Sequence, residues 1–76
     1  MKKADVNIGY RAAEEVSRLV SEKYGTLKNL FRRMNLMYKL YYNWQCGDTP
    51  DGRSLAKLLD AGADVVYILS GRRFEA

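Results

Sequence analysis

The sequence contains no histidine, one cysteine and one proline, and these shortages exclude several classes of protein. Without histidine, neither a Cys/His zinc site nor a histidine-based catalytic triad can form. A single thiol, Cys46, cannot form a disulfide within the chain, which favours a reducing compartment. The longest hydrophobic run, residues 65–69, is far shorter than the roughly twenty residues that a membrane-spanning helix needs. We therefore expect a cytoplasmic protein that is neither secreted nor membrane-bound.

The 76 residues are expected to form one domain over residues 1–76, with room for a single small core. Their net charge of +4 is unevenly distributed. Residues 23–47 carry five basic residues and no acidic one, whereas basic and acidic residues nearly cancel on either side. This excess permits a polyanionic partner, although a solvated helical face with unpaired lysines would produce the same pattern.

The spacing of apolar residues predicts an all-α fold of five short helices. In the first helix, apolar residues recur at intervals of three and four from Ala13 to Tyr24, and Gly25 supplies a left-handed stop. Thr26 is a suitable N-cap for the second helix, and Asn35 suits a tight turn after it. The predicted helices span residues 10–24, 27–34, 37–46, 53–61 and 65–70.

The last two predicted helices follow a loop around Pro50. Gly62 ends the fourth helix and Asp64 caps the fifth, which we expect to turn Val65, Ile68 and Leu69 inward. Residues 65–69 also have strand propensity, but a single short strand would have no partner in this chain.

The third predicted helix, residues 37–46, has two distinct faces. At about 100° per residue, the stripe that we expect to face the core consists of Met37, Leu40, Tyr41 and Trp44. A helix with its side chains is about 10 to 12 Å across, which fits a B-DNA major groove about 12 Å wide. In that groove a lysine can donate to guanine and an asparagine can pair with adenine. The candidate base contacts on the opposite face are Tyr38, Lys39, Tyr42 and Asn43.

Basic residues on and beside the preceding helix suit contacts with the phosphate backbone, where each neutralised phosphate releases counterions. The candidate phosphate contacts are Thr26, Lys28, Arg32 and Arg33.

Two segments resemble a known family. Residues 26–30 and 35–47 look like the helix-turn-helix of the lambda-repressor-like domains found in temperate phage repressors and Cro proteins, and residues 55–71 are similar to the family's closing helices. The resemblance covers about residues 10–71. It implies a five-helix domain that binds operator DNA as a dimer and reads bases through Tyr38, Lys39 and Asn43. Leu27, Phe31 and Asn35 replace the family's usual glutamine, alanine and glycine, which predicts a helix pair that is wider or repacked.

We therefore expect a phage or prophage-type transcriptional repressor that acts by operator occupancy in the cytoplasm of a bacterial or phage-infected host cell. It would act as a homodimer, with no catalysis, cofactor, metal or small-molecule substrate. The candidate dimer surface is Val66, Tyr67 and Phe74. The alternative is a protein-binding module on the same scaffold, such as an antirepressor or repressor-assembly factor. The apolar and aromatic content of residues 37–42 supports that alternative.

Overall fold

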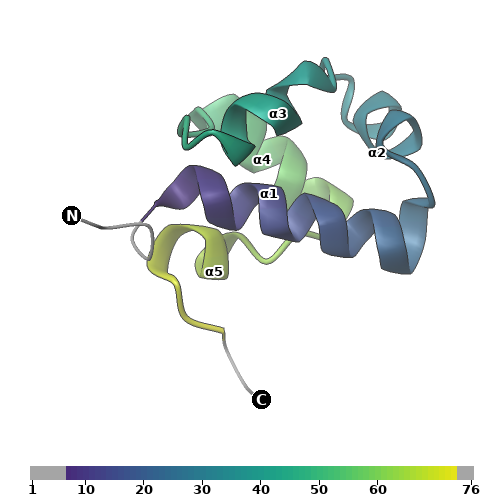
Figure 1. Ribbon diagram of the computed structural model, residues 1–76. Helices are drawn as coiled ribbons and strands as arrows, with labels where there is room; N and C mark the ends of the chain where they lie inside the picture. Colours follow the sequence, from purple (N-terminus) through teal and green to yellow (C-terminus); the bar gives the residue numbers. More distant parts are fainter. Residues whose placement is uncertain (1–6, 74–76) are drawn as a thin grey trace.

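Five α-helices and one π-helical turn build the described part of the chain, residues 7–73 of the computed structural model (Figure 1). These residues contain no strand, so the predicted all-helical fold is confirmed. None of the helices within them combines the length and the apolarity needed to cross a membrane. The elements are α1 (Ile8–Leu19), η2 (Val20–Tyr24), α2 (Leu27–Met34), α3 (Lys39–Gln45), α4 (Gly52–Ala61) and α5 (Val65–Ser70).

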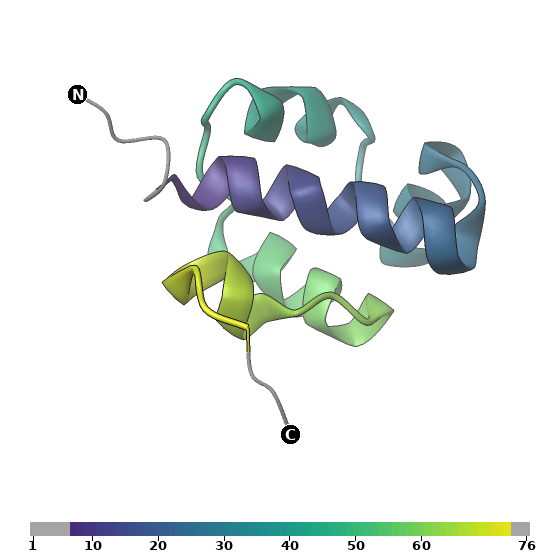
Figure 2. The same cartoon turned by 60° about the horizontal axis from the view of Figure 1, so that its bottom comes forward.

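Helix α1 lies at the centre, with α3 on one side and α5 on the other (Figure 2). Helix α2 packs against α4 and the π-helical turn η2. The two largest buried side chains, Trp44 of α3 and Phe31 of α2, place their ring centroids 6.0 Å apart. Phe31 is therefore a core residue that connects these two helices. The buried apolar side chains are Ala12, Ala13, Val16, Leu19, Leu30, Phe31, Met34, Trp44, Leu58, Ala61, Ala63 and Ile68.

The first turn of α1 contacts the segment that follows α3 directly through the backbone. A Cβ atom at Gly9 would lie only 2.2 Å from the carbonyl oxygen of Asp48, so no other residue type fits there without moving the chain. The side chain of Asn7 caps α1 by accepting a hydrogen bond from Tyr10 N, and it also donates to the carbonyl of Gly47 at 3.2 Å. The C-terminal end of α3 is thus fixed against the start of α1.

The predicted caps and turns agree with the structure. The Thr26 hydroxyl accepts from the backbone N–H of Asn29 at 3.1 Å, and Asp64 accepts from that of Tyr67 at 2.9 Å. Asn35 ends α2 in the left-handed conformation, with φ at 57°. The predictions at these three positions are confirmed, because each residue type suits the backbone conformation found there.

Two residues predicted to face the core are exposed instead. Helix α3 begins at Lys39 rather than at residue 37, and Met37 lies in the preceding connection with 66% of its surface exposed. Leu36 packs against the core there, so its neighbour Met37 points away. Leu69 is 50% exposed because α5 buries Ile68, and the next residue lies about 100° further around the helix.

Candidate nucleic-acid interface

Three of the four candidate base contacts project from the exposed side of α3. Tyr38 and Tyr42 are 48% and 51% exposed, and Lys39 is also exposed. Asn43 is half-buried. Residues four apart on a helix are neighbours, so Tyr38 and Tyr42 form one row and Lys39 and Asn43 form the row beside it. The structure therefore brings these four residues together on one side of α3.

The opposite side of α3 is held against α1. Trp44 is buried in the core. The Tyr41 hydroxyl lies 3.1 Å from the Ser17 hydroxyl of α1 and accepts from Gln45 Nε2 at 3.0 Å. Buried apolar contact and a hydrogen bond between helices together fix the rotation of α3 about its axis. The orientation of the exposed row, Tyr38 and Tyr42, is consequently fixed relative to α1.

A groove of about 470 Å³ lies between α3 and the loop that leads to α4. Leu40 and Trp44 contribute apolar surface to it, while Lys39 and Asn43 line it from α3. Asp48 and Asp51 also line it. The Asp51 carboxylate caps α4 by accepting from the backbone N–H of Ser54 at 2.8 Å, and this hydrogen bond lowers the pKa of Asp51. Arg53 lines the groove as well, so two basic side chains, Lys39 and Arg53, accompany the two carboxylates there.

The candidate phosphate contacts lie on α2 and at its start, and all four are exposed. Among them, Arg33 forms an ion pair with Asp60 of α4, with 3.0 Å between Nη1 and Oδ2. Both side chains of that pair are more than half exposed, so the pair is weak and exchangeable. Lys28 and Arg32 make no ion pair with any described residue, and neither does Lys39 on α3.

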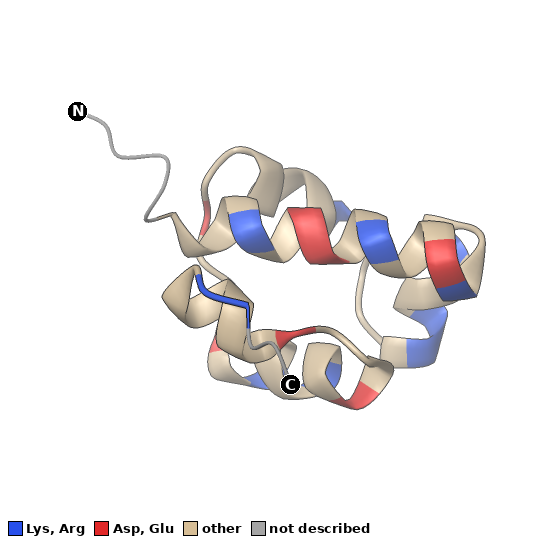
Figure 3. Ribbon diagram, turned by 90° about the horizontal axis from the view of Figure 1, so that it is seen from below, with Lys and Arg blue, Asp and Glu red and all other residues tan. Residues whose placement is uncertain are grey.

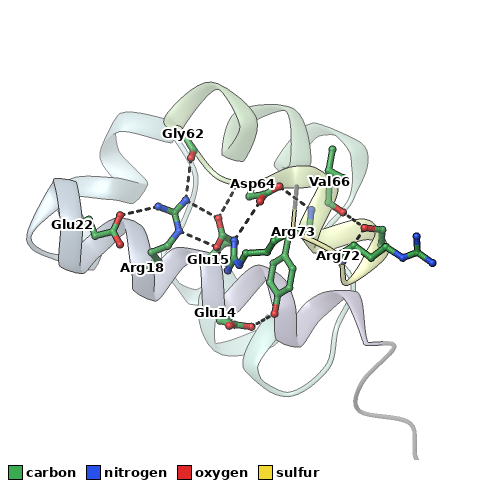
Figure 4. Close-up of polar contacts among 11 residues, drawn as sticks. Glu14, Glu15, Arg18, Glu22, Gly62, Asp64, Val66, Arg72 and Arg73 are labelled. Atoms are coloured by element: carbon green, nitrogen blue, oxygen red, sulfur yellow. Dashed lines mark hydrogen bonds and ion pairs between the residues drawn. The ribbon is translucent and has the colours of Figure 1, made fainter. Parts of the chain in front are cut away.

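The other side of the molecule, between α1 and α5, has paired charges. Basic and acidic positions alternate along α1 (Figure 3). Glu15 is fully buried and accepts two hydrogen bonds from Arg18, one from Arg73 and one from the backbone N–H of Asp64, at 2.7 to 3.0 Å (Figure 4). Burial alone would raise the pKa of Glu15, but these hydrogen bonds outweigh it and lower the pKa to about 2.

The candidate dimer surface is only partly available. Val66 is exposed. The Tyr67 hydroxyl donates to Glu14 at 2.5 Å, which raises the pKa of Tyr67, and the Arg73 guanidinium lies 3.9 Å from the centre of its ring. Tyr67 is therefore engaged within its own chain. Phe74 lies outside the described residues.

Two buried charges were not identified from the sequence. Glu15 lies three residues after Ala12 and four before Leu19, on the buried stripe of α1, and this spacing was the available signal. Arg11 is also buried and donates from Nε to the carbonyl of Ile68 at 2.9 Å. Both residues connect α1 to the C-terminal part of the chain, so their role is to support the fold.

The described residues contain no group of three carboxylate, thiol or imidazole side chains that could hold a metal ion. No protein-family model, curated protein or solved structure matches this chain. The resemblance to lambda-repressor-like domains therefore stays a prediction from the sequence.

Proposed function

We propose that the protein binds double-stranded DNA with sequence preference and acts as a phage or prophage-type transcriptional repressor. In this proposal α2, the left-handed turn at Asn35 and α3 form a helix-turn-helix of the lambda-repressor-like kind. The observation that carries it is that residues 23–47, which include α2 and α3, hold five basic residues and no acidic one. Lys28 and Arg32 on α2 and Lys39 on α3 make no ion pair within the described residues, and they lie on the two helices of this proposed motif.

The dimensions of α3 support this proposal. With its side chains, a helix such as α3 is about 10 to 12 Å across, which fits a major groove about 12 Å wide. Lys39 would donate to guanine and Asn43 would pair with adenine. Helix α2 would cross the backbone, where Lys28, Arg32 and Arg33 neutralise phosphates.

Repression would follow from operator occupancy, without catalysis. One short helix reads few base pairs, so we propose a homodimer that reads two half-sites about one helical turn apart. Val66 on α5 is the exposed member of the candidate dimer surface. Such a protein would act in the cytoplasm.

Selection from a pool of random DNA duplexes on the purified protein tests the proposal, and enrichment of a palindromic sequence is the expected result. Binding of the enriched duplex and of a scrambled duplex is then measured by fluorescence anisotropy. Replacing Lys39 and Asn43 together by alanine should reduce the ratio of the two affinities at least tenfold, because each bidentate base contact contributes about 1 to 3 kcal/mol of discrimination.

The control is Lys23→Ala, which removes one positive charge from η2 and should leave that ratio unchanged. Circular dichroism establishes that both variants are folded. An unchanged ratio in the Lys39/Asn43 variant would remove the base-reading role of α3.

A second candidate function is binding to another protein through the same face. The observation in its favour is the exposure of Met37, Tyr38 and Tyr42, because methionine and tyrosine are enriched in protein interfaces. A selection that enriches no DNA sequence would favour this function over DNA binding.

A further inference from the structure

The exposed side of α3 carries little formal charge for a surface that would enter DNA. Lys39 is its one charged residue. Around it lie three large side chains, Met37, Tyr38 and Tyr42, which we name the α3 ridge and which are about half to two-thirds exposed. Neither tyrosine hydroxyl of the ridge has a hydrogen-bond partner within residues 7–73. The ridge therefore offers mainly apolar and aromatic surface to a partner.

An apolar ridge can distinguish base pairs because the groups that it would remove from water differ between them. In the major groove the 5-methyl group of thymine is the apolar feature of the base edges, while guanine and cytosine present hydrogen-bonding groups. Covering such a polar edge with a methionine or a tyrosine ring, without a replacement hydrogen bond, is unfavourable. Covering a thymine methyl group is favourable by roughly 0.8 kcal/mol per buried carbon.

The spacing within the ridge fits stacked base pairs. Tyr38 and Tyr42 are four residues apart, which places their Cβ atoms about 5 to 6 Å from each other along α3. This separation lies between one and two base-pair rises of about 3.4 Å. Two rings on one helix lying along the groove can therefore meet thymines one or two steps apart on one strand.

Part of the ridge is also held in place before any contact with DNA. The Tyr42 ring packs edge-on against Tyr41, with centroids 5.3 Å apart and planes at 67°. Tyr41 is in turn hydrogen-bonded to Ser17 of α1. A ring already restricted by its neighbours loses less conformational entropy on binding, so its contact contributes more to affinity.

We propose, on the basis of the DNA-binding function above, that the protein prefers thymine-containing operator sites and recognises thymine by its 5-methyl group through the α3 ridge. Asn43, in the row beside it, pairs with a neighbouring adenine. The ridge contributes base preference, while Lys28 and Arg32 contribute affinity for any sequence.

Replacing thymidine by deoxyuridine in the DNA tests this directly, since uracil lacks only the methyl group and the protein stays unchanged. The duplex enriched from the random pool is synthesised with thymidine and with deoxyuridine, and both forms are titrated with the protein over a range of salt concentrations. The expected result is an affinity about threefold to fourfold weaker for each methyl group that the ridge touches. The dependence on salt should stay the same, because the phosphate contacts are retained.

A double variant, Tyr38→Ser with Tyr42→Ser, assigns the effect to the ridge and should bind the two forms of the duplex more nearly equally. Tyr10→Ser, which removes an exposed tyrosine from α1, is the matched control and should keep the full difference. Equal affinity of wild-type protein for both forms, or an enriched duplex without thymine, would overturn the ridge inference and leave DNA binding intact. A pool that yields no enriched sequence would overturn both proposals.

Discussion

The charges on the two sides of α1 are arranged in opposite ways. On the α5 side, Glu15 is buried and holds Arg18 and Arg73 in a network of hydrogen bonds. On the α2 and α3 side, Lys28 and Arg32 are exposed and make no ion pair with a described residue. Charge that is buried and paired supports the fold, whereas charge that is exposed and unpaired remains available to a partner. The two sides should therefore respond differently to the same kind of substitution.

The largest effect is expected at Glu15. Glu15→Ala should lower the free energy of unfolding by about 2 to 3 kcal/mol, because it removes the acceptor that Arg18 and Arg73 share, although water can still reach both guanidinium groups. Urea denaturation measures the change. The control is Glu22→Ala, since Glu22 pairs with the same Arg18 but is 60% exposed, and its cost should stay below about 1 kcal/mol. Equal losses of unfolding free energy at Glu15 and Glu22 would show that the buried carboxylate supports the fold no more than the exposed one does.

Acid should weaken the paired side through the same residue. The pKa of Glu15 is about 2 in the folded protein against 4.5 for an ordinary glutamate, so its ionised form stabilises the fold fully above about pH 5. This contribution, on the order of 2 to 3 kcal/mol, disappears as the pH falls from about 5 towards about 2. Thermal unfolding at about pH 6 and about pH 3 measures it. Glu15→Gln should be less sensitive to pH over this interval, and a wild-type dependence in that variant would assign the effect to other carboxylates.

On the unpaired side, substitutions should change DNA binding and leave the fold intact. Replacing Arg32 and Arg33 together by alanine should reduce the slope of log affinity against log salt concentration by about 0.9 for each phosphate that is no longer neutralised. Stability should change by less than about 0.5 kcal/mol. Arg72→Ala, which removes an exposed charge beyond α5, should leave the slope unaltered. If the double variant keeps the wild-type slope, α2 is not the phosphate-binding element.

The smallest effect is expected at the one described ion pair that reaches α2. Asp60→Asn releases Arg33 and removes a negative charge beside it, so affinity for duplex DNA should rise about twofold to threefold at low salt, a few tenths of a kcal/mol. The rise should disappear when Arg33→Ala is combined with Asp60→Asn. A rise that persists without Arg33 would show a general charge effect rather than release of this residue.

The sequence predicted features that depend on neighbours in the chain. Thr26, Asn35 and Asp64 were identified as caps or turns because the residue type itself suits the required backbone. Periodicity also placed Tyr38 and Tyr42 on the exposed side of α3. It failed at Met37, because the same spacing is compatible with a helix that begins two residues later.

Features that depend on contacts across the fold could not be predicted in this way. Glu15 and Arg73 are 58 residues apart, and Arg33 and Asp60 are 27 apart, so nothing in their local sequence indicates that they meet. The groove beside Asn43 likewise depends on how the loop before α4 folds back over α3. The exposure of Tyr38 and Tyr42 was therefore predictable from the sequence, but the ion pairs of the fold were not.

Because Gly9 has no side chain, the position of α3 is set by a backbone contact that is independent of the residues on the exposed face of α3. Main chain rests on main chain at this junction, so the seating of α3 does not depend on which residues point outward from it. The exposed residues of α3 can then be replaced by others without disturbing the backbone contact at Gly9. A side chain introduced at residue 9 would have the opposite effect, because it would displace the segment that follows α3 and so change the orientation of α3 and of its exposed side chains.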